Sequence, residues 1–273
     1  MALCSLLVGA GCNAEPTTVA TATAALTVPT VRRPAPPADC PEGMARVDDF
    51  CIDRFEAHLV DAGAPSVLLP HCERPPSRVK YMAASSAGAK PQAYISRVEA
   101  ARACRAADKR LCTARQWHRA CGGTRGSRYP YGDQPLAGRC NTGKPHLMTK
   151  LFGGETKYTY DAHYNNPRLA LEPGFLAASG EYRDCVNDWG VHDMVGNLHE
   201  WVADPVSRKL EKEVPLEFGP HGLGHDGSGV FMGGYFSSAA EHGHGCTYVT
   251  ATHSPNYHDY SIGFRCCSDL AAH

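Results

Sequence analysis

The sequence predicts a single compact α+β domain with little regular secondary structure: two helices and several short antiparallel strands joined by long loops. Apolar residues repeat with helical spacing in only two stretches, and they alternate like a strand in several short ones. The 273 residues include 27 glycines and 20 prolines, which favour turns and loops. The 13 cysteines show no repeated metal-finger spacing and therefore indicate disulfides.

The composition limits the compartment and the partners. Disulfides persist in oxidising compartments, so the cysteine content predicts an exported protein; a cytosolic protein with free or metal-bound thiols is the alternative. The formal net charge is −1, which argues against a nucleic-acid partner. No stretch approaches the roughly 20 apolar residues of a membrane helix, so we expect membrane contact only through a lipid anchor.

The first part of the chain is interpreted as a leader and a tether. Residues 1–11 are apolar and end in small residues before Cys12, which resembles a bacterial lipoprotein signal peptide. Cys12 would then be the lipidated first residue of a cell-envelope lipoprotein, with ordinary secretion as the alternative. Residues 12–39 are rich in alanine, threonine and proline and predict a flexible tether. The folded domain is expected over residues 40–273.

Two segments predict helices. Residues 95–107 carry a helical stripe of apolar residues, and Ser96 with Glu99 forms a capping box at the start. Residues 114–121 form the second helix, which Thr113 can cap and a Gly-Gly pair ends.

The remaining segments predict short strands and loops. A hairpin is expected over residues 44–56, and three further strands are expected over residues 230–236, 245–252 and 261–267. Residues 57–92 contain several prolines and no clean period, which predicts a long ordered loop anchored by Cys72. Residues 206–229 are polar, then rich in glycine and histidine, and predict an exposed insertion.

The stretch of residues 191–204 combines residue types that rarely occur together. The Gly-Asn pair in its middle is a turn signal, and Asp193 and Glu200 flank it. Carboxylates and turn carbonyls are the oxygen ligands that calcium prefers. A turn capped by its own polar side chains explains the same residues equally well. Arg265 is expected to form a buried ion pair with an acid of this stretch.

Several motifs then follow one another in a characteristic order. They are Lys109-Arg110-Leu111, Trp117, Ala120-Cys121-Gly122-Gly123, Tyr129-Pro130-Tyr131-Gly132, Cys140-Asn141, Gly190 to Trp201, Gly233-Gly234 and Gly263-Phe264-Arg265-Cys266. Together they cover about residues 44–267, and they resemble the formylglycine-generating enzyme (sulfatase-modifying factor) family. The resemblance implies one compact domain with a C-type-lectin-like fold, in agreement with the pattern of short elements.

The resemblance also implies calcium sites. One would use the side chains of Asp193 and Glu200, and the carbonyls of Gly196 and Leu198 would complete it. A second calcium site would begin at Asn141, but its other ligands are not recognisable in this sequence.

Family disulfides would pair Cys104 with Cys266 and Cys121 with Cys246. Each would restrict the unfolded chain by several kcal/mol, on the order of 4. The pairing of the other cysteines in the folded part stays open, and because their number is odd we expect one unpaired thiol. They are Cys40, Cys51, Cys72, Cys112, Cys140, Cys185 and Cys267.

The catalytic cysteine pair of the family is missing. The resemblance implies a copper and oxygen reaction that uses two cysteines just after the Gly-Gly strand, because copper(I) prefers soft thiolates. The matching positions fall near Ser238 and Gly243, and neither is cysteine. We therefore predict that this protein does not make formylglycine by that mechanism.

The same region offers a different set of side chains: His242, His244, His253, His258 and Asp259. In a strand, His242, His244 and Cys246 would lie on one face. Imidazoles with a carboxylate suit iron, copper or zinc. Alternatively, the histidines lie in an exposed loop, and His258 with Asp259 is a hydrogen-bonded pair in a turn. Nearby tyrosines, Tyr257 and Tyr260, either line a pocket or pack in the core.

Two functions remain open. The first is an exported, metal-dependent enzyme that oxidatively modifies a protein or peptide through the histidines and Asp259, with calcium holding the scaffold. The second is a non-catalytic, calcium-stabilised cell-surface module that binds a protein, peptide or glycan. Convergence of the five side chains in a cleft would favour the enzyme, and their scatter would favour the binding module.

Overall fold

The structure is a computed structural model that describes residues 40–154, 157–215, 217–218, 224–238 and 245–270. The predicted signal peptide, Cys12, the tether over residues 12–39, and the candidate ligands His242 and His244 lie outside the described residues. Among the described residues, no helix is both long and apolar enough to cross a membrane.

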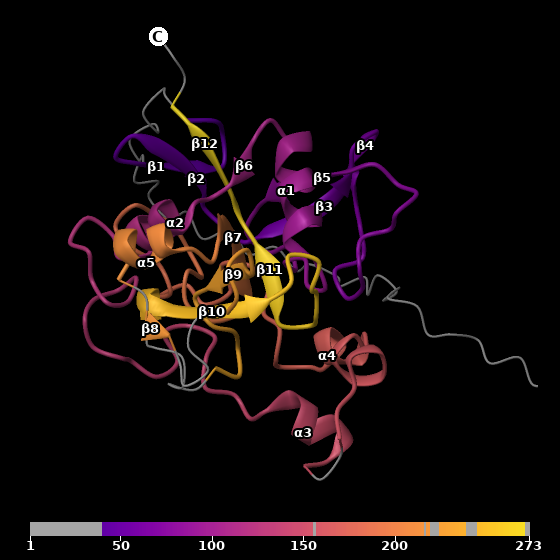
Figure 1. Ribbon diagram of the computed structural model, residues 1–273. Helices are drawn as coiled ribbons and strands as arrows, with labels where there is room; N and C mark the ends of the chain where they lie inside the picture. The colour runs from indigo at the N-terminus through magenta and orange to yellow at the C-terminus, as the bar shows by residue number, and fades with distance from the viewer. Residues whose placement is uncertain (1–39, 155–156, 216, 219–223, 239–244, 271–273) are drawn as a thin grey trace, which may run out of the picture.

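Three sheets organise the domain (Figure 1). The four-stranded sheet has the order β1 (Met44–Val47), β2 (Phe50–Asp53), β12 (Cys266–Asp269) and β6 (Arg110–Leu111). The five-stranded sheet has the order β11 (Ile262–Phe264), β7 (His199–Pro205), β9 (Gly229–Met232), β10 (Tyr248–His253) and β8 (Glu217–Phe218). The three-stranded sheet has the order β4 (Ala64–Leu68), β3 (Ala57–Asp61) and β5 (Tyr81–Ser85).

Short helices connect and cover these sheets. The α-helices are α1 (Arg97–Ala106), α2 (Ala114–Cys121), α3 (Leu147–Phe152), α4 (Arg168–Leu171) and α5 (Arg208–Glu213). A π-helical turn, η1, spans Tyr160–Tyr164, and a 3₁₀ turn, η2, spans Gly245–Thr247. The two predicted helices are confirmed, and both begin with a capping box in which the cap side chain and the N3 side chain bond each other's backbone N–H.

Two loop predictions were wrong. Residues 57–92 hold all three strands of the smallest sheet, and β3 pairs with β5 from Ala57↔Ser85 to Asp61↔Tyr81. The alternation was hard to see because β3 is buried on both faces and β5 is rich in alanine. Residues 206–229 are not simply an exposed insertion, since Leu210 and Val214 pack into the core.

Disulfides join distant parts of the chain. The structure contains the two bridges that the resemblance implies, Cys104–Cys266 and Cys121–Cys246. It also contains Cys40–Cys51, Cys112–Cys267 and Cys140–Cys185, and Cys72 is disulfide-bonded as well. The unpaired thiol that we expected is therefore not among the described cysteines.

The last two strands link the larger sheets. β11 runs parallel to β7, with Gly263 opposite Glu200, whereas β12 pairs antiparallel with β2 and β6. Figure 1 shows β11 and β12 as a nearly continuous yellow ribbon that passes from one sheet to the other. Arg265 is the single residue between these two strands, and it is fully buried where the sheets meet.

Candidate functional site

The Gly-Asn turn of the central stretch is held by Glu56, which follows β2. The Asn197 side chain donates to Glu56 Oε2 at 2.6 Å, and the Leu198 N–H donates to Glu56 Oε1 at 3.1 Å. The turn needs glycine at Gly196, because φ is +83° and a Cβ there would collide with the backbone oxygen of Asn141. The turn is thus capped by a carboxylate from another element.

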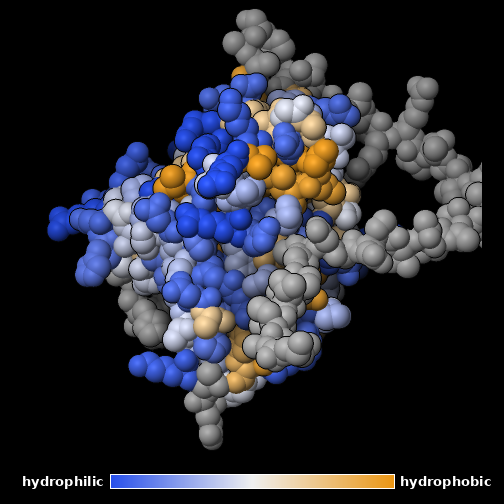
Figure 2. All heavy atoms as spheres, turned by 90° about the vertical axis from the view of Figure 1, so that its right-hand side faces the viewer, coloured by the Kyte–Doolittle hydropathy of each residue, from blue (hydrophilic) through white to orange (hydrophobic). Residues whose placement is uncertain are grey.

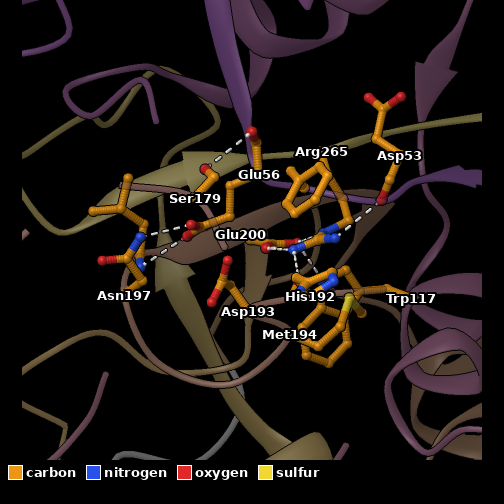
Figure 3. Close-up of polar contacts among 12 residues, drawn as sticks. Asp53, Glu56, Trp117, Ser179, His192, Asp193, Met194, Asn197, Glu200 and Arg265 are labelled. Carbon is orange, nitrogen blue, oxygen red and sulfur yellow. Dashed lines mark hydrogen bonds and ion pairs between the residues drawn. The ribbon is translucent and has the colours of Figure 1, made fainter. Parts of the chain in front are cut away.

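Arg265 forms the buried ion pair that the sequence predicted. Its Nε and Nη2 donate to the two oxygens of Glu200, each at 2.6 Å, and its remaining donors bond the carbonyls of Asp53 and His192 (Figure 3). Trp117 Nε1 also donates to Glu200 Oε2 at 2.6 Å. Each of these hydrogen bonds of the guanidinium is therefore made to another group of the protein, in a fixed geometry.

Negative charge exceeds positive charge around this pair. We call Glu56, Trp117, Asp193, Glu200 and Arg265 the Arg265 cluster. Burial, and then the charges of Asp193 and Glu200, raise the pKa of Glu56 well above its usual value. Burial, with the Glu200 charge adding to it, raises the pKa of Asp193 to about 6. Three buried carboxylates face one guanidinium, so the cluster favours uptake of a proton.

Two of the expected calcium ligands, the side chains of Asp193 and Glu200, lie in this cluster, but they already have partners. Glu200 bonds Arg265 and Trp117, and Asp193 Oδ2 accepts the Gly180 N–H at 2.6 Å. Calcium would therefore compete with Arg265 for Glu200, and the calcium site stays a prediction. At the second expected site, Asn141 Oδ1 is buried and has no hydrogen-bond partner among the described residues.

A second, more open site lies beside β7, β9 and β10. It is a pocket of about 880 Å³, and we call it the tyrosine pocket. Its rings form a continuous wall in the order Tyr160, Tyr257, His253, Phe231, His199, Tyr235 and Tyr260, with neighbouring centroids 4.0–6.0 Å apart. The rest of the lining includes Lys144, His146, Tyr164, Ser237, Ser238, Tyr248, Thr250, Asp259 and Ser261.

Asp259 lies at the buried end of this wall. Tyr257 donates its hydroxyl to Asp259 Oδ2 at 2.7 Å, and Ser261 donates its N–H and hydroxyl to Oδ1 at 2.8 and 2.7 Å. Burial raises the pKa of Asp259, although these hydrogen bonds oppose the shift. Burial lowers the pKa of His253, whose ring stacks on Tyr257. The carboxylate is satisfied from within the protein, and the rings remain to contact a ligand.

The structure brings together only part of the predicted catalytic set. His253 and Asp259 line the tyrosine pocket, whereas the His258 ring faces Asn165, with Nδ1 at 2.7 Å from Asn165 Oδ1. Within the described part of the chain, no three His, Cys, Asp or Glu side chains are grouped so as to hold a metal ion. A transition-metal site at His242 and His244 stays a prediction.

The pocket also contains residues that the sequence prediction missed. Tyr257 and Tyr260 line it, as one of the two alternatives held, but Tyr160, Tyr164 and Tyr235 were not anticipated. The available signal was the local density of tyrosine around residues 158–164 and 248–260. Ser238 lines the pocket too, and it stands near one of the two cysteine positions that the resemblance implies.

The comparisons with known proteins place the chain in a family. The chain matches the family model "Sulfatase-modifying factor enzyme 1-like domain" over residues 22–270. No curated protein matches. Among solved structures, PvdO from Pseudomonas aeruginosa is 17% identical, with a TM-score of 0.45, and the match covers 81% of this chain and 80% of that chain. CarF is 14% identical, with a TM-score of 0.43 and coverage of 85% and 95%.

The Major Tropism Determinant I1 variant is 13% identical, with a TM-score of 0.47; the match covers 86% of this chain and 55% of that chain. The present chain thus spans about half the length of that protein. Since the family model matches nearly the whole described domain, this chain belongs to the sulfatase-modifying factor family and has the C-type-lectin-like fold expected of it.

Proposed function

We propose that this protein is an exported, non-catalytic binding member of its family that holds a neutral oligosaccharide in the tyrosine pocket. The observation that carries the proposal is the ring wall of the pocket that Ser238 also lines, near a position where the resemblance implies a catalytic cysteine. Five disulfides among the described residues are consistent with an oxidising, exported compartment.

The cysteine chemistry that the resemblance implies needs a free thiol close to Ser238. Cys246 is the nearest cysteine along the chain after Ser238, and it is bonded to Cys121. A disulfide sulfur offers no thiolate to copper(I). The protein is therefore not expected to make formylglycine, and aldehyde formed on a sulfatase-type peptide with copper and oxygen would overturn this expectation.

The charges of the lining favour a neutral ligand. Asp259 is bonded by Tyr257 and Ser261, and the Lys144 ammonium donates to the carbonyls of Gly174 and Phe175. A charged ligand would therefore have to compete with these internal partners for the same groups.

The uncharged groups of the pocket lining suit a sugar. Phenol rings offer flat apolar faces together with hydroxyls, and the pocket adds the hydroxyls of Ser237, Ser238 and Thr250. A sugar ring presents C–H groups on its faces and hydroxyls at its edge, so it can stack on Tyr160 or Tyr235 and hydrogen-bond around it. The volume of about 880 Å³ accommodates more than one such ring.

Calorimetric titration with a panel of neutral and acidic oligosaccharides tests the proposal. We expect a neutral one to bind, and Tyr160→Ala to weaken it at least about tenfold, because a stacked aromatic contributes about 1.5 kcal/mol beyond its buried area. Tyr131→Ala, outside the pocket, is the matched control. The proposal fails if no oligosaccharide binds, or if the two variants lose affinity equally.

The metal-dependent enzyme is the second candidate, because His253 and Asp259 of the predicted catalytic set do line one pocket. Its test is the metal content of the purified protein after dialysis against a mild chelator. About one iron, copper or zinc per chain, lost in His242→Ala and His253→Ala but retained in His225→Ala, would make the oxidative enzyme the leading function.

Anchoring through Cys12 belongs to the proposal as well. A lipoprotein of this type carries a lipid on Cys12, so Cys12→Ser is expected to release the protein from the membrane fraction. Equal release of both forms would instead support ordinary secretion.

A further inference from the structure

A second hollow lies along α1, and it shares no lining residue with the tyrosine pocket. Its volume is about 470 Å³. The apolar part of its lining comes from three elements and consists of Val98, Ala101, Leu111 and Ala203. Val98 is 51% exposed, although it is a large aliphatic residue in the first turn of α1. We call this hollow the arginine groove.

Arginines surround this apolar surface. Arg97 and Arg105 lie on the same face of α1 as Ala101, each four residues away from it, and Arg110 lies on β6. Arg97 crosses to the opposite wall, where Nη1 donates to the Ala203 carbonyl at 2.7 Å. Among the residues that the structure describes, no acidic residue lines the groove, although the charge of neighbouring Asp204 acts on Arg97.

The three arginines differ in the hydrogen-bond and ion-pair partners of their guanidinium groups. Arg110 bonds Gln116 and the exposed carboxylate of Asp269, each at 2.6 Å. Arg105 is exposed and has no ion-pair partner among the described residues. Positive charge at the groove is therefore in excess, and Arg105 is the group best able to pair with a carboxylate from outside.

We propose that the arginine groove docks an acidic, amphipathic peptide segment of a partner protein. An apolar side chain of that segment would cover Val98 and Ala101, and its carboxylates would pair with Arg105 and Arg110. Guanidinium and carboxylate groups form paired hydrogen bonds of fixed geometry, so this arrangement selects for acidic residues. Charge complementarity of this kind mainly determines which partner binds.

The surroundings of the groove add apolar surface. Figure 2 faces the side of the molecule where α1 and the β3–β4–β5 sheet lie, and it shows a hydrophobic patch beside strongly hydrophilic residues there. The large exposed apolar residues of this region are Val67, Leu68, Val79 and Val98. A partner that extends beyond the groove would thus find further apolar contact.

Fluorescence anisotropy with the full chain and two labelled ten-residue peptides tests the proposal. One peptide alternates glutamate and leucine, and the other alternates lysine and leucine. We expect the acidic peptide to bind at least about tenfold more tightly. Arg105→Glu should weaken its binding by about tenfold or more, whereas Arg208→Glu, the same charge change on exposed α5, should change it less than about twofold.

A second pair of variants tests the apolar surface. Val98→Asp is expected to weaken binding of the acidic peptide, whereas Leu136→Asp, at a residue that is 47% exposed and outside the groove and its apolar surroundings, is expected to leave that binding unchanged. Equal affinity for the two peptides, or equal effects of Arg105→Glu and Arg208→Glu, would overturn the proposal. The proposal would also be overturned if the protein associated with itself, or bound phosphatidylglycerol vesicles in place of the acidic peptide, and Arg105→Glu abolished that interaction.

Discussion

The Arg265 cluster and the tyrosine pocket lie in one domain and use polar groups in opposite ways. In the Arg265 cluster, the guanidinium and the Glu200 carboxylate are almost completely buried, and each is bonded by several protein groups. In the tyrosine pocket, the one carboxylate is satisfied from within, and the rings of Tyr160 and Tyr235 face an open volume. The first site fixes the fold, and the second has surface left for a ligand.

The residues that indicate family membership lie in a different site from those that would determine activity. The Gly-Asn turn, Glu200 and Arg265 belong to the motifs that resemble the family, and they join the two larger sheets. Ser238, which stands near a position where the resemblance implies a cysteine, lines the pocket instead. We therefore expect this chain to keep the scaffold of its family without the cysteine chemistry that the resemblance implies.

Removing the positive charge of Arg265 should have the largest effect on stability. Arg265→Met leaves Glu200 buried without its partner, and we expect the free energy of unfolding to fall by about 3–5 kcal/mol. Urea denaturation measures this change. Adding Glu200→Gln should restore part of the loss, because the unpaired charge is then removed. A loss below about 1 kcal/mol would show that the pair is not a fixed part of the core.

The turn of the cluster offers a matched pair of glycines. Gly196 and Gly138 have φ of +83° and +77°, but only Gly196 has atoms in the path of a Cβ. Gly138→Ala should cost about 1–2 kcal/mol from backbone strain alone. Gly196→Ala should cost about 2–4 kcal/mol, because overpacking adds to that strain. Equal losses in thermal or urea unfolding would mean that the turn can move away from Asn141.

Calcium should act on the cluster and leave the pocket unaffected. A cation offsets the repulsion among Glu56, Asp193 and Glu200. At about 100 times its dissociation constant, calcium added to chelator-treated protein is expected to raise the free energy of unfolding by about 2.7 kcal/mol. Asp193→Asn should remove the gain, and magnesium serves as the control. Unchanged unfolding in calcium would rule out the predicted site.

Acidic pH should produce the smallest effect, through the pocket. Burial lowers the folded-state pKa of His253, so its contribution to stability is complete above about pH 6.5 and is lost as pH falls toward the folded-state value. Between pH 7.5 and 5, the wild type should lose more stability than His253→Gln. His225→Gln, at an exposed position, is the control and should follow the wild type.

Sequence patterns predicted the elements that have local signals. The capping boxes at Ser96 and Thr113 and the ion pair of Arg265 were predicted, because cap chemistry and a buried arginine each leave a recognisable residue type. The three-stranded sheet was missed, since its β3 strand is buried on both faces and so lacks alternation.

The pocket could be predicted only in part. Its wall joins rings from η1, β9, β10 and the segment before β11, and their proximity depends on tertiary contacts between distant segments. Tyr257 and Tyr260 were plausible lining residues, but no local pattern distinguishes a tyrosine that lines a pocket from one that packs. Glu56 was missed as the cap of the central turn for the same reason, because its partner Asn197 is 141 residues away.

The order in which the chain is made gives Arg265, Cys266 and Cys267 a further consequence. These adjacent residues supply the internal cation and two disulfide partners, for Cys104 on α1 and for Cys112. A chain exported from its N-terminus would therefore present its helices and the earlier strands of both larger sheets before β11, β12 and the residues that lock them together emerge. For the exported protein proposed above, we expect folding of this domain to follow translocation, and the early cysteines to depend on oxidative folding catalysts to avoid wrong pairings until then.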